Sequence, residues 1–504
     1  MEKTTHSVNF RIPFTSANVI VCLICTAGLL LTGISHAKTT LSIEDVDEAQ
    51  VTTENHNPER GGLALTVNNY GIAFGNVPVV HGLRFNLRDV NLNQVNGANI
   101  TILAPREPSY GTVRGLALGL PMTGGASITG VSVALGGITV EESIRGIQFA
   151  LLGIGTGTGI SGITVAGLGF GAGGNIGGIN IAGLGIGADG HVTGITVAGL
   201  GLGADGNVSG INIAGLGLGA DGHVTGITVA GLGFGTDGNV SGINVAGLGF
   251  GSGGHATGIN YATLGFGAGY NASGINIAGL GLGADGHVTG ITVAGLGFGT
   301  DGNVSGINVA GLGFGSGGSV AGINYATIGF GAGDYVSGLS AAFLGIGAGE
   351  GVRGISFAGL GIGSGGSIVG VSVAGLGLAA GDEIRGISLA GLGIASGESV
   401  CGIAFAGLGI ASRQLRGVTV SPSAASWGLA RGAFFAPAYF RIEDGTLQGV
   451  SVSAFNHIRG HQQGITIGLY NYARHLKGVQ IGVMNYAANN PRGLRLLPLV
   501  NANL

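Results

Sequence analysis

Charged residues are scarce in this chain of 504 residues. They make up 9% of it, against about a quarter in an average globular domain, and the formal net charge is −4. Disordered chains combine low hydrophobicity with high net charge, whereas 45% of these residues are hydrophobic. The composition therefore predicts an ordered protein. Its charge is neither basic enough to predict a nucleic-acid partner nor acidic enough to predict a store of cations.

Cysteine is almost absent. Cys22 and Cys25 lie in the apolar run "VIVCLICTAGLLL" (19–31), which basic residues precede and a small-residue site ending at Ala37 follows. This is the pattern of a secretory signal peptide over residues 1–37. A membrane anchor is the alternative, although the run is short for a bilayer span. Cleavage after Ala37 would leave Cys401 as the single cysteine, so we expect no intrachain disulfide.

Long apolar runs are missing after residue 37. Glycine interrupts the apolar residues at every second or third position, and glycine is costly inside a helix. No later segment therefore qualifies as a transmembrane helix. A membrane role would require β-structure or attachment to the membrane surface.

The groups that catalysis requires are also missing over much of the chain. Between residues 162 and 321 there is no Lys, Arg or Glu, and the only charged residues are aspartates. This stretch contains no acid–base pair and no activated nucleophile. Segments such as "GLGFGAGG" (167–174) match a dinucleotide-binding pattern, but nothing helical follows them, so the match is incidental. We predict no enzyme, no catalytic residue and no cofactor.

Glycine, in contrast, is abundant, with 111 residues. It recurs every sixteen residues without a slip from Gly130 to Gly402, and looser copies start at Gly82, Gly97 and Gly115. The consensus is G-I-[TN]-[VI]-A-G-L-G-[FLI]-G-[AST]-[DG]-G-[NH]-V-[ST], in which position 1 is the recurring glycine. Apolar residues alternate at positions 2 and 4 and again at positions 7 and 9. Two short strands per repeat are predicted, joined by a Gly corner and an Asp-Gly turn.

These features predict an all-β repeat architecture, most simply a parallel β-solenoid with one coil per repeat. In the copy that starts at Gly210 we expect one set of side chains to point inward and another to face solvent. The inward set is Ile211, Ile213, Leu216, Leu218 and Val224. The outward set is Asn212, Asp221, Gly222, His223 and Thr225. Stacked coils would share backbone hydrogen bonds and form ladders of identical side chains.

An antiparallel β-meander, either open or closed into an outer-membrane barrel, is the rival architecture. It is favoured by a 32-residue alternation, Thr196 then Asn212 at position 3 and His191 then Asn207 at position 14, because a hairpin would produce such a double unit. Duplication of two coils would produce it as well. The two folds differ in register, because only parallel stacking places Ile195 beside Ile211.

Three rows of polar residues are candidate binding sites. Aspartates at position 12 could form a calcium ladder, but each coil supplies one carboxylate, so we expect exposed turns instead. Histidines at position 14 lie two coils apart and are too sparse for zinc, so no metal site is predicted. A flat row of threonines can bind ice, but asparagine interrupts the row at position 3. The aspartates are Asp189, Asp205, Asp221, Asp237, Asp285 and Asp301, and the histidines are His191, His223, His255 and His287.

The two ends differ from the middle, as the ends of a stack must. We expect a polar leader over 38–81, N-terminal capping repeats over 82–129, the regular array over 130–417, an irregular insert over 418–448 and C-terminal capping repeats over 449–504. Nine basic and two acidic residues follow residue 402. This basic end could contact an anionic surface or another protein.

The C-terminal repeats carry a resemblance. "GITIGLYNYA" (464–473) and "GVQIGVMNYA" (478–487), followed by "LRLLPLVN" (494–501), resemble the leptospiral-type surface-repeat protein family, which has relatives in other diderm bacteria. The sixteen-residue copies depart from that motif, with Ala-Gly-Leu-Gly where the family has Gly-x-x-Asn. The resemblance implies an exported cell-surface or outer-membrane protein with a structural or adhesive role, and it supplies no catalytic residues. Membrane association remains open, and an outer-membrane barrel or meander is the alternative.

Overall fold

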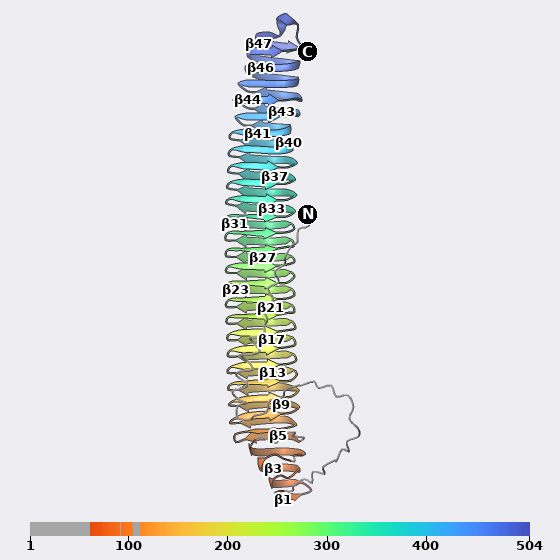
Figure 1. Ribbon diagram of the computed structural model, residues 1–504, viewed down its shortest axis with the longest axis vertical. Coiled ribbons are helices and arrows are strands. Elements are labelled where there is room, and N and C mark those ends of the chain that lie inside the picture. Colours follow the sequence, from red (N-terminus) through yellow and green to blue (C-terminus); the bar gives the residue numbers. More distant parts are fainter. Residues whose placement is uncertain (1–60, 91, 104–110, 504) are drawn as a thin grey trace, which may run out of the picture. The chain divides into compact units, whose positions relative to one another are not determined.

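The computed structural model describes residues 61–90, 92–103 and 111–503. The expected signal peptide and most of the expected leader lie outside these residues. The chain divides into two compact units, Met1–Ser252 and Gly253–Leu504. Each unit is built from β-strands (Figure 1), and the only helical segment among the described residues is the 3-10 turn η1 (Arg492–Leu494).

One coil of sixteen residues contains a long strand and a short strand, as β17 (Val208–Ala214) and β18 (Gly217–Ala220) illustrate. The long strand is rich in β-branched residues, and an Ala-Gly-Leu corner leads to the short one. β15 (Val192–Ala198) and β17 pair in parallel with Ile195 beside Ile211. Each unit is therefore a parallel β-solenoid, as predicted, and the antiparallel alternative is wrong for the array.

The first unit begins with β1 (Gly62–Val67) and β2 (Tyr70–Gly75), which pair in antiparallel fashion. Its long strands are β3 (Val79–Arg88), β4 (Gln94–Leu103), β5 (Thr112–Gly119), β7 (Ser127–Ala134), β9 (Ser143–Ala150), β11 (Gly159–Ala166), β13 (Ile176–Ala182), β15, β17, β19 (Val224–Ala230) and β21 (Val240–Ala246). Its short strands are β6 (Thr123–Gly125), β8 (Gly137–Val140), β10 (Gly153–Thr156), β12 (Gly169–Ala172), β14 (Gly185–Ala188), β16 (Gly201–Ala204), β18, β20 (Gly233–Thr236) and β22 (Gly249–Ser252).

The second unit continues the same alternation. Its long strands are β23 (Ala256–Ala262), β25 (Ala272–Ala278), β27 (Val288–Ala294), β29 (Val304–Ala310), β31 (Val320–Ala326), β33 (Tyr335–Ala342), β35 (Gly351–Ala358), β37 (Ser367–Ala374) and β39 (Glu383–Ala390). Its short strands are β24 (Gly265–Ala268), β26 (Gly281–Ala284), β28 (Gly297–Thr300), β30 (Gly313–Ser316), β32 (Gly329–Ala332), β34 (Gly345–Ala348), β36 (Gly361–Ser364) and β38 (Gly377–Ala380). The last coils contain β40 (Gly393–Ala406), β41 (Gly409–Val420), β42 (Ser423–Ser426), β43 (Leu429–Phe435), β44 (Tyr439–Ile442), β45 (Thr446–Val452), β46 (Phe455–Ala487) and β47 (Leu496–Asn503).

The core of each coil is thin. The long strand contributes residues such as Val224 and Ala230, and the short strand contributes Phe234, all of them buried. Identical side chains stack along the unit. The rings of Phe298 and Phe314, for example, lie 4.5 Å apart and nearly parallel. Stacking of aromatic and aliphatic ladders thus supplies the apolar contacts that an ordinary core supplies between layers.

The predicted orientation of the long strand is wrong. Ile211 and Ile213 are 38% and 41% exposed, whereas Asn212 between them is fully buried. Leu216 at the corner is exposed as well, while Leu218 and Val224 are buried as predicted. The reason is that each long strand runs from position 15 of one repeat to position 5 of the next. Side chains alternate along a strand, so the residues at positions 15, 3 and 5 point inward together. In β17 the inward side thus carries Val208, Asn212 and Ala214.

The recurring glycine at position 1 is required by the backbone. Gly210 has a φ of +103°, a conformation that residues with a side chain rarely adopt. A Cβ atom on Gly210 would lie 2.0 Å from the carbonyl oxygen of Gly194 in the preceding coil. Position 1 therefore sets the period of the repeat because no other residue fits there.

The ends differ in part from expectation. The first strands, β1 and β2, lie inside the expected polar leader (38–81), so part of that segment belongs to the strands of the first unit. The segment 418–448, predicted to be an irregular insert, continues the parallel ladder from Gly417 through Gly432 to Gly449, with uneven coil lengths. At the C-terminus β47 pairs antiparallel with β46. This reversal ends the parallel stack.

Candidate functional site

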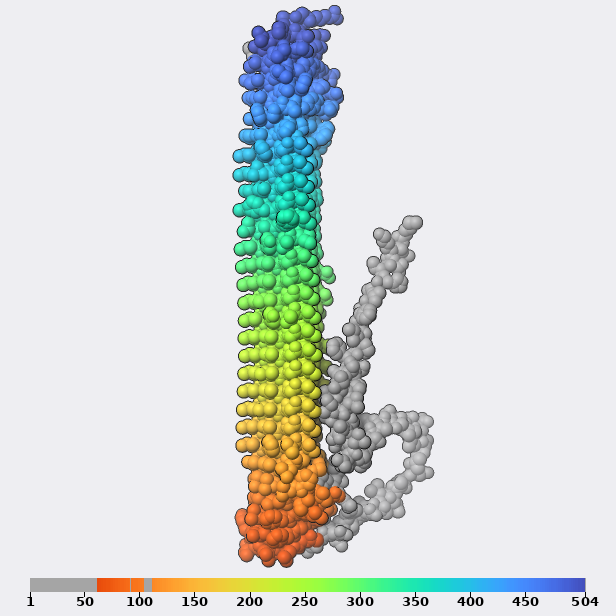
Figure 2. All heavy atoms as spheres, turned by 90° about the vertical axis from the view of Figure 1, so that its left-hand side faces the viewer, coloured from red at the N-terminus to blue at the C-terminus, as the bar shows by residue number. Residues whose placement is uncertain are grey.

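The outward side of the long strands forms an apolar surface that we call the isoleucine face. We define it by the strands β11 to β21 and β23 to β33, which carry an isoleucine at position 2 of every coil but one, a second apolar residue at position 4, and mostly Ser or Thr at position 16. In the first unit its position 2 residues are Ile163, Ile179, Ile195, Ile211, Ile227 and Ile243, and in the second unit they are Ile259, Ile275, Ile291, Ile307, Ile323 and Leu339. Figure 2 shows how side chains of successive coils line up in rows within each unit.

The isoleucine face is also uncharged. No charged residue occurs in the long strands from β11 to β21, or in those from β23 to β33. Exposed leucines at the neighbouring corner, such as Leu216 and Leu232, extend the apolar surface around one edge of the coil. Soluble monomers seldom expose a continuous apolar patch larger than about 300–600 Å². This surface is therefore the strongest candidate for a binding function.

The outward side of the short strands is different, and we call it the glycine face. Glycines at positions 8 and 10 leave bare backbone on this side. A Cβ atom on Gly203 or Gly219 would have no heavy atom within 4 Å, and neither residue has a positive φ. Unlike Gly210, these glycines are not required by the fold of the chain.

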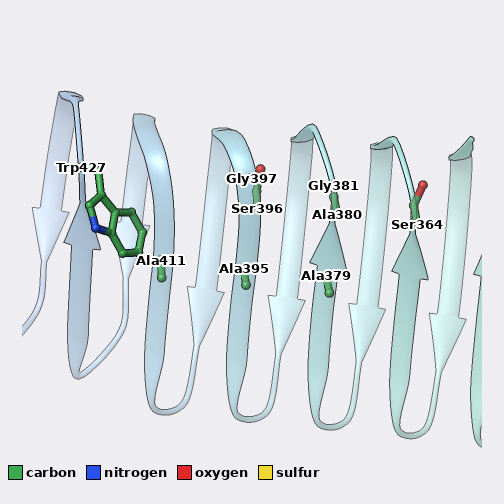
Figure 3. A pocket seen from close by; sticks show the side chains of 9 residues that line it. All are labelled: Ser364, Ala379, Ala380, Gly381, Ala395, Ser396, Gly397, Ala411 and Trp427. Carbon is green, nitrogen blue, oxygen red and sulfur yellow. The ribbon is translucent and has the colours of Figure 1, made fainter.

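The glycine face ends in a shallow groove, where alanine replaces glycine at Ala379, Ala395 and Ala411. The single tryptophan, Trp427, is 54% exposed and lies beside Ala411 at the end of this row (Figure 3). The groove has a volume of about 390 Å³, near the lower end for small-molecule sites. Its lining is mostly methyl groups, and the hydroxyl of Ser396 already donates to a backbone carbonyl. It could seat a flat apolar group but offers no catalytic chemistry.

The edge opposite the leucines consists of turns. The aspartates at position 12 are exposed there, as expected. At position 14, each side chain accepts a hydrogen bond from the backbone of the next coil. The N–H of Asn207 donates to Nδ1 of His191 at 2.9 Å, and that of His223 donates to Oδ1 of Asn207 at 2.7 Å. Histidine and asparagine are interchangeable at this position because both carry an acceptor at the δ1 position.

The polar row at position 3 is buried and does not face solvent. In the second unit, Nδ2 of Asn260 donates to Oδ1 of Asn276 at 2.9 Å. In the first unit, where threonine and asparagine alternate, the hydroxyls of Thr196 and Thr228 have no hydrogen-bond partner. The ice-binding interpretation of this row fails because its side chains lie inside the coil.

At the N-terminal end of the same buried row lies a charged cluster that was not predicted from the sequence. Arg84 and Asp89 form a fully buried ion pair. Nδ2 of Asn99 and Oγ1 of Thr101 donate to the Asp89 carboxylate at 3.0 and 3.2 Å. Arg84 and Asp89 are five residues apart, whereas Asn99 and Thr101 reach them through the pairing of adjacent coils. The position of the cluster inside the first coils fits a structural role.

The basic end retains free positive charge. Of its nine basic residues, three form ion pairs with Glu398 or Glu443, and these three are Arg413, Arg441 and Arg459. Nearby, burial lowers the pKa of His457, and the Arg459 and Arg441 guanidinium groups lower it further. Oη of Tyr439 lies 3.4 Å from Nδ1 of His457.

Within the described part of the chain, no group of three or more His, Cys, Asp or Glu residues could hold a metal ion. The described residues also include no helix with the length and hydropathy needed to cross a bilayer. No protein-family model, curated protein or solved structure matches the chain. The functional argument therefore rests on the surfaces of the coils.

Proposed function

We propose that this chain is an exported repeat protein of the bacterial cell envelope, with a structural or adhesive role and no catalytic activity. The observation that carries the proposal is the isoleucine face, a surface that repeats one chemistry from coil to coil. Such a surface offers area for attachment, whereas catalysis needs a few different groups that converge on one point.

Two features of the sequence support the location. The N-terminal pattern is that of a secretory signal peptide, and residues 464–501 resemble the leptospiral-type surface-repeat family. We place the protein at the cell surface or outer membrane of a diderm bacterium. The unpaired basic residues near the C-terminus, such as Arg474 and Lys477, provide a contact for an anionic envelope component or another protein.

Cell fractionation tests this proposal. We expect the chain, shortened by its first 37 residues, in the envelope fraction, and we expect urea or carbonate to release it. External protease should digest it on intact cells, while a periplasmic marker stays protected. Recovery of the uncleaved chain from the cytoplasm would refute the proposal.

A further inference from the structure

We infer that the isoleucine face is a self-association surface that binds the same face of a second copy of this chain. The inference goes beyond the proposed function and does not depend on where the protein is located. It rests on the area, the charge and the repeat spacing of the face.

The area is sufficient for a stable dimer. A long strand of seven residues spans about 23 Å, and coils are about 4.8 Å apart, so each coil presents about 110 Å². The six uncharged long strands from β11 to β21 thus present about 700 Å² within the first unit alone, close to the roughly 800 Å² that each partner contributes to a standard interface. The second unit offers six such strands from β23 to β33.

The charge of the face favours a neutral partner. Two copies can approach without repulsion because no charged side chain lies on these strands. Proteins that lie on anionic membranes usually present lysine and arginine beside their apolar residues. The regular part of the isoleucine face has neither.

The repeat spacing favours an identical partner. Rows at position 2 and at position 4 run along each unit at the spacing of paired strands. An identical face has the same spacing, so a contact made by one coil is repeated by every other coil. A twofold axis across the face gives a closed and symmetric interface. Packed sheets of this kind lie about 10 Å apart.

Sedimentation velocity of the full exported chain over a range of concentrations tests the inference. We expect a dimer, and we expect Ile195→Thr with Ile211→Thr to raise the dissociation constant at least a hundredfold, because the symmetric interface loses four isoleucine side chains. The matched control is Gly203→Ser with Gly219→Ser, which adds hydroxyls to the glycine face of the same two coils. The control should dimerise like the parent chain.

A second measurement leaves the isoleucines intact, in case the double variant does not fold. Thr225 lies at position 16 on the outward side of β19, beside the isoleucine row. A spin label at Thr225→Cys, in a chain carrying Cys401→Ser, should show dipolar coupling between copies, and a label at Gly219→Cys should show weaker coupling. A chain that stays monomeric at all concentrations would overturn the inference. A dimer that is lost only in the glycine-face control would also overturn it. The same holds for a monomer that floats with phosphatidylcholine vesicles and no longer does so when the isoleucines are substituted.

Discussion

Replacing Gly210 by alanine should destabilise the first unit far more than replacing Gly219 by alanine in the same coil. Both changes add one methyl group to one sixteen-residue repeat. They differ in backbone conformation and in the space around the new Cβ atom. The pair therefore isolates the reason for the glycine period.

The magnitude follows from the geometry. At Gly210 the positive φ costs a residue with a side chain about 1–2 kcal/mol. The new Cβ atom would also lie 2.0 Å from the Gly194 oxygen, and relief of this overlap would pull apart strands that are hydrogen-bonded on both sides. We expect a total loss of about 3–5 kcal/mol. At Gly219 nothing is contacted, and reduced freedom of the unfolded chain should stabilise by about 0.4–1 kcal/mol.

Thermal unfolding followed by far-ultraviolet circular dichroism measures both variants. A unit of this size shifts its Tm by roughly 2–4 °C per kcal/mol, so Gly210→Ala should lower the Tm by roughly 10 °C and Gly219→Ala should raise it slightly. Hydrogen exchange should locate the loss of protection in β17 and its two neighbours. Equal destabilisation by the two variants would refute the reasoning, because it would mean that the glycine face also tolerates no side chain.

Four other changes have defined outcomes. Thr228→Val should stabilise the chain by about 1 kcal/mol in urea unfolding, because it removes a buried hydroxyl without a hydrogen-bond partner; a loss of stability would mean that the hydroxyl is satisfied. Asp89→Asn should cost about 3–5 kcal/mol in the same assay, since it leaves the Arg84 charge buried and unpaired. His223→Ala should cost about 0.5–1.5 kcal/mol by removing an acceptor for the next coil, whereas His223→Asn should be neutral. The lowered pKa of His457 means that the unfolded chain binds the proton first, so stability should fall as the pH drops below about 6.5, and His457→Gln should weaken this dependence in unfolding measurements at pH 7.5 and 5.5.

The period and pairing of the coils could be predicted from the sequence, because an unbroken sixteen-residue register admits few structures. The orientation of the long strand was predicted wrongly. Val208 and Ile211 are three residues apart in one strand and cannot both point inward. Hydrophobicity alone places isoleucine inside, but in β17 the inward side carries Val208, Asn212 and Ala214.

The candidate binding surface was missed for the same reason. Once isoleucine is assigned to the core, the outer surface of the coil looks polar and featureless. In the buried cluster, Arg84 and Asp89 are five residues apart, but Asn99 and Thr101 join them only through the register of the next coil, which local patterns do not reveal. The turn histidines were recognised as surface residues, but their bonds to the next coil follow from a geometry that only the stacked strands provide.

The identity of successive coils has a consequence for how the gene can change. Residues 210–273 and 274–337 are nearly the same sequence, so a recombination event between them removes or adds 64 residues. A gain joins Gly210 to the coil that normally precedes Gly274, and a loss joins Gly274 to the coil that normally precedes Gly210. The new junction reproduces one that the chain already contains, because the coils that start at Gly210 and Gly274 have the same sequence. Length can therefore vary among descendants in whole coils while the surface chemistry stays constant, which makes the number of repeats a trait that selection can adjust separately from stability.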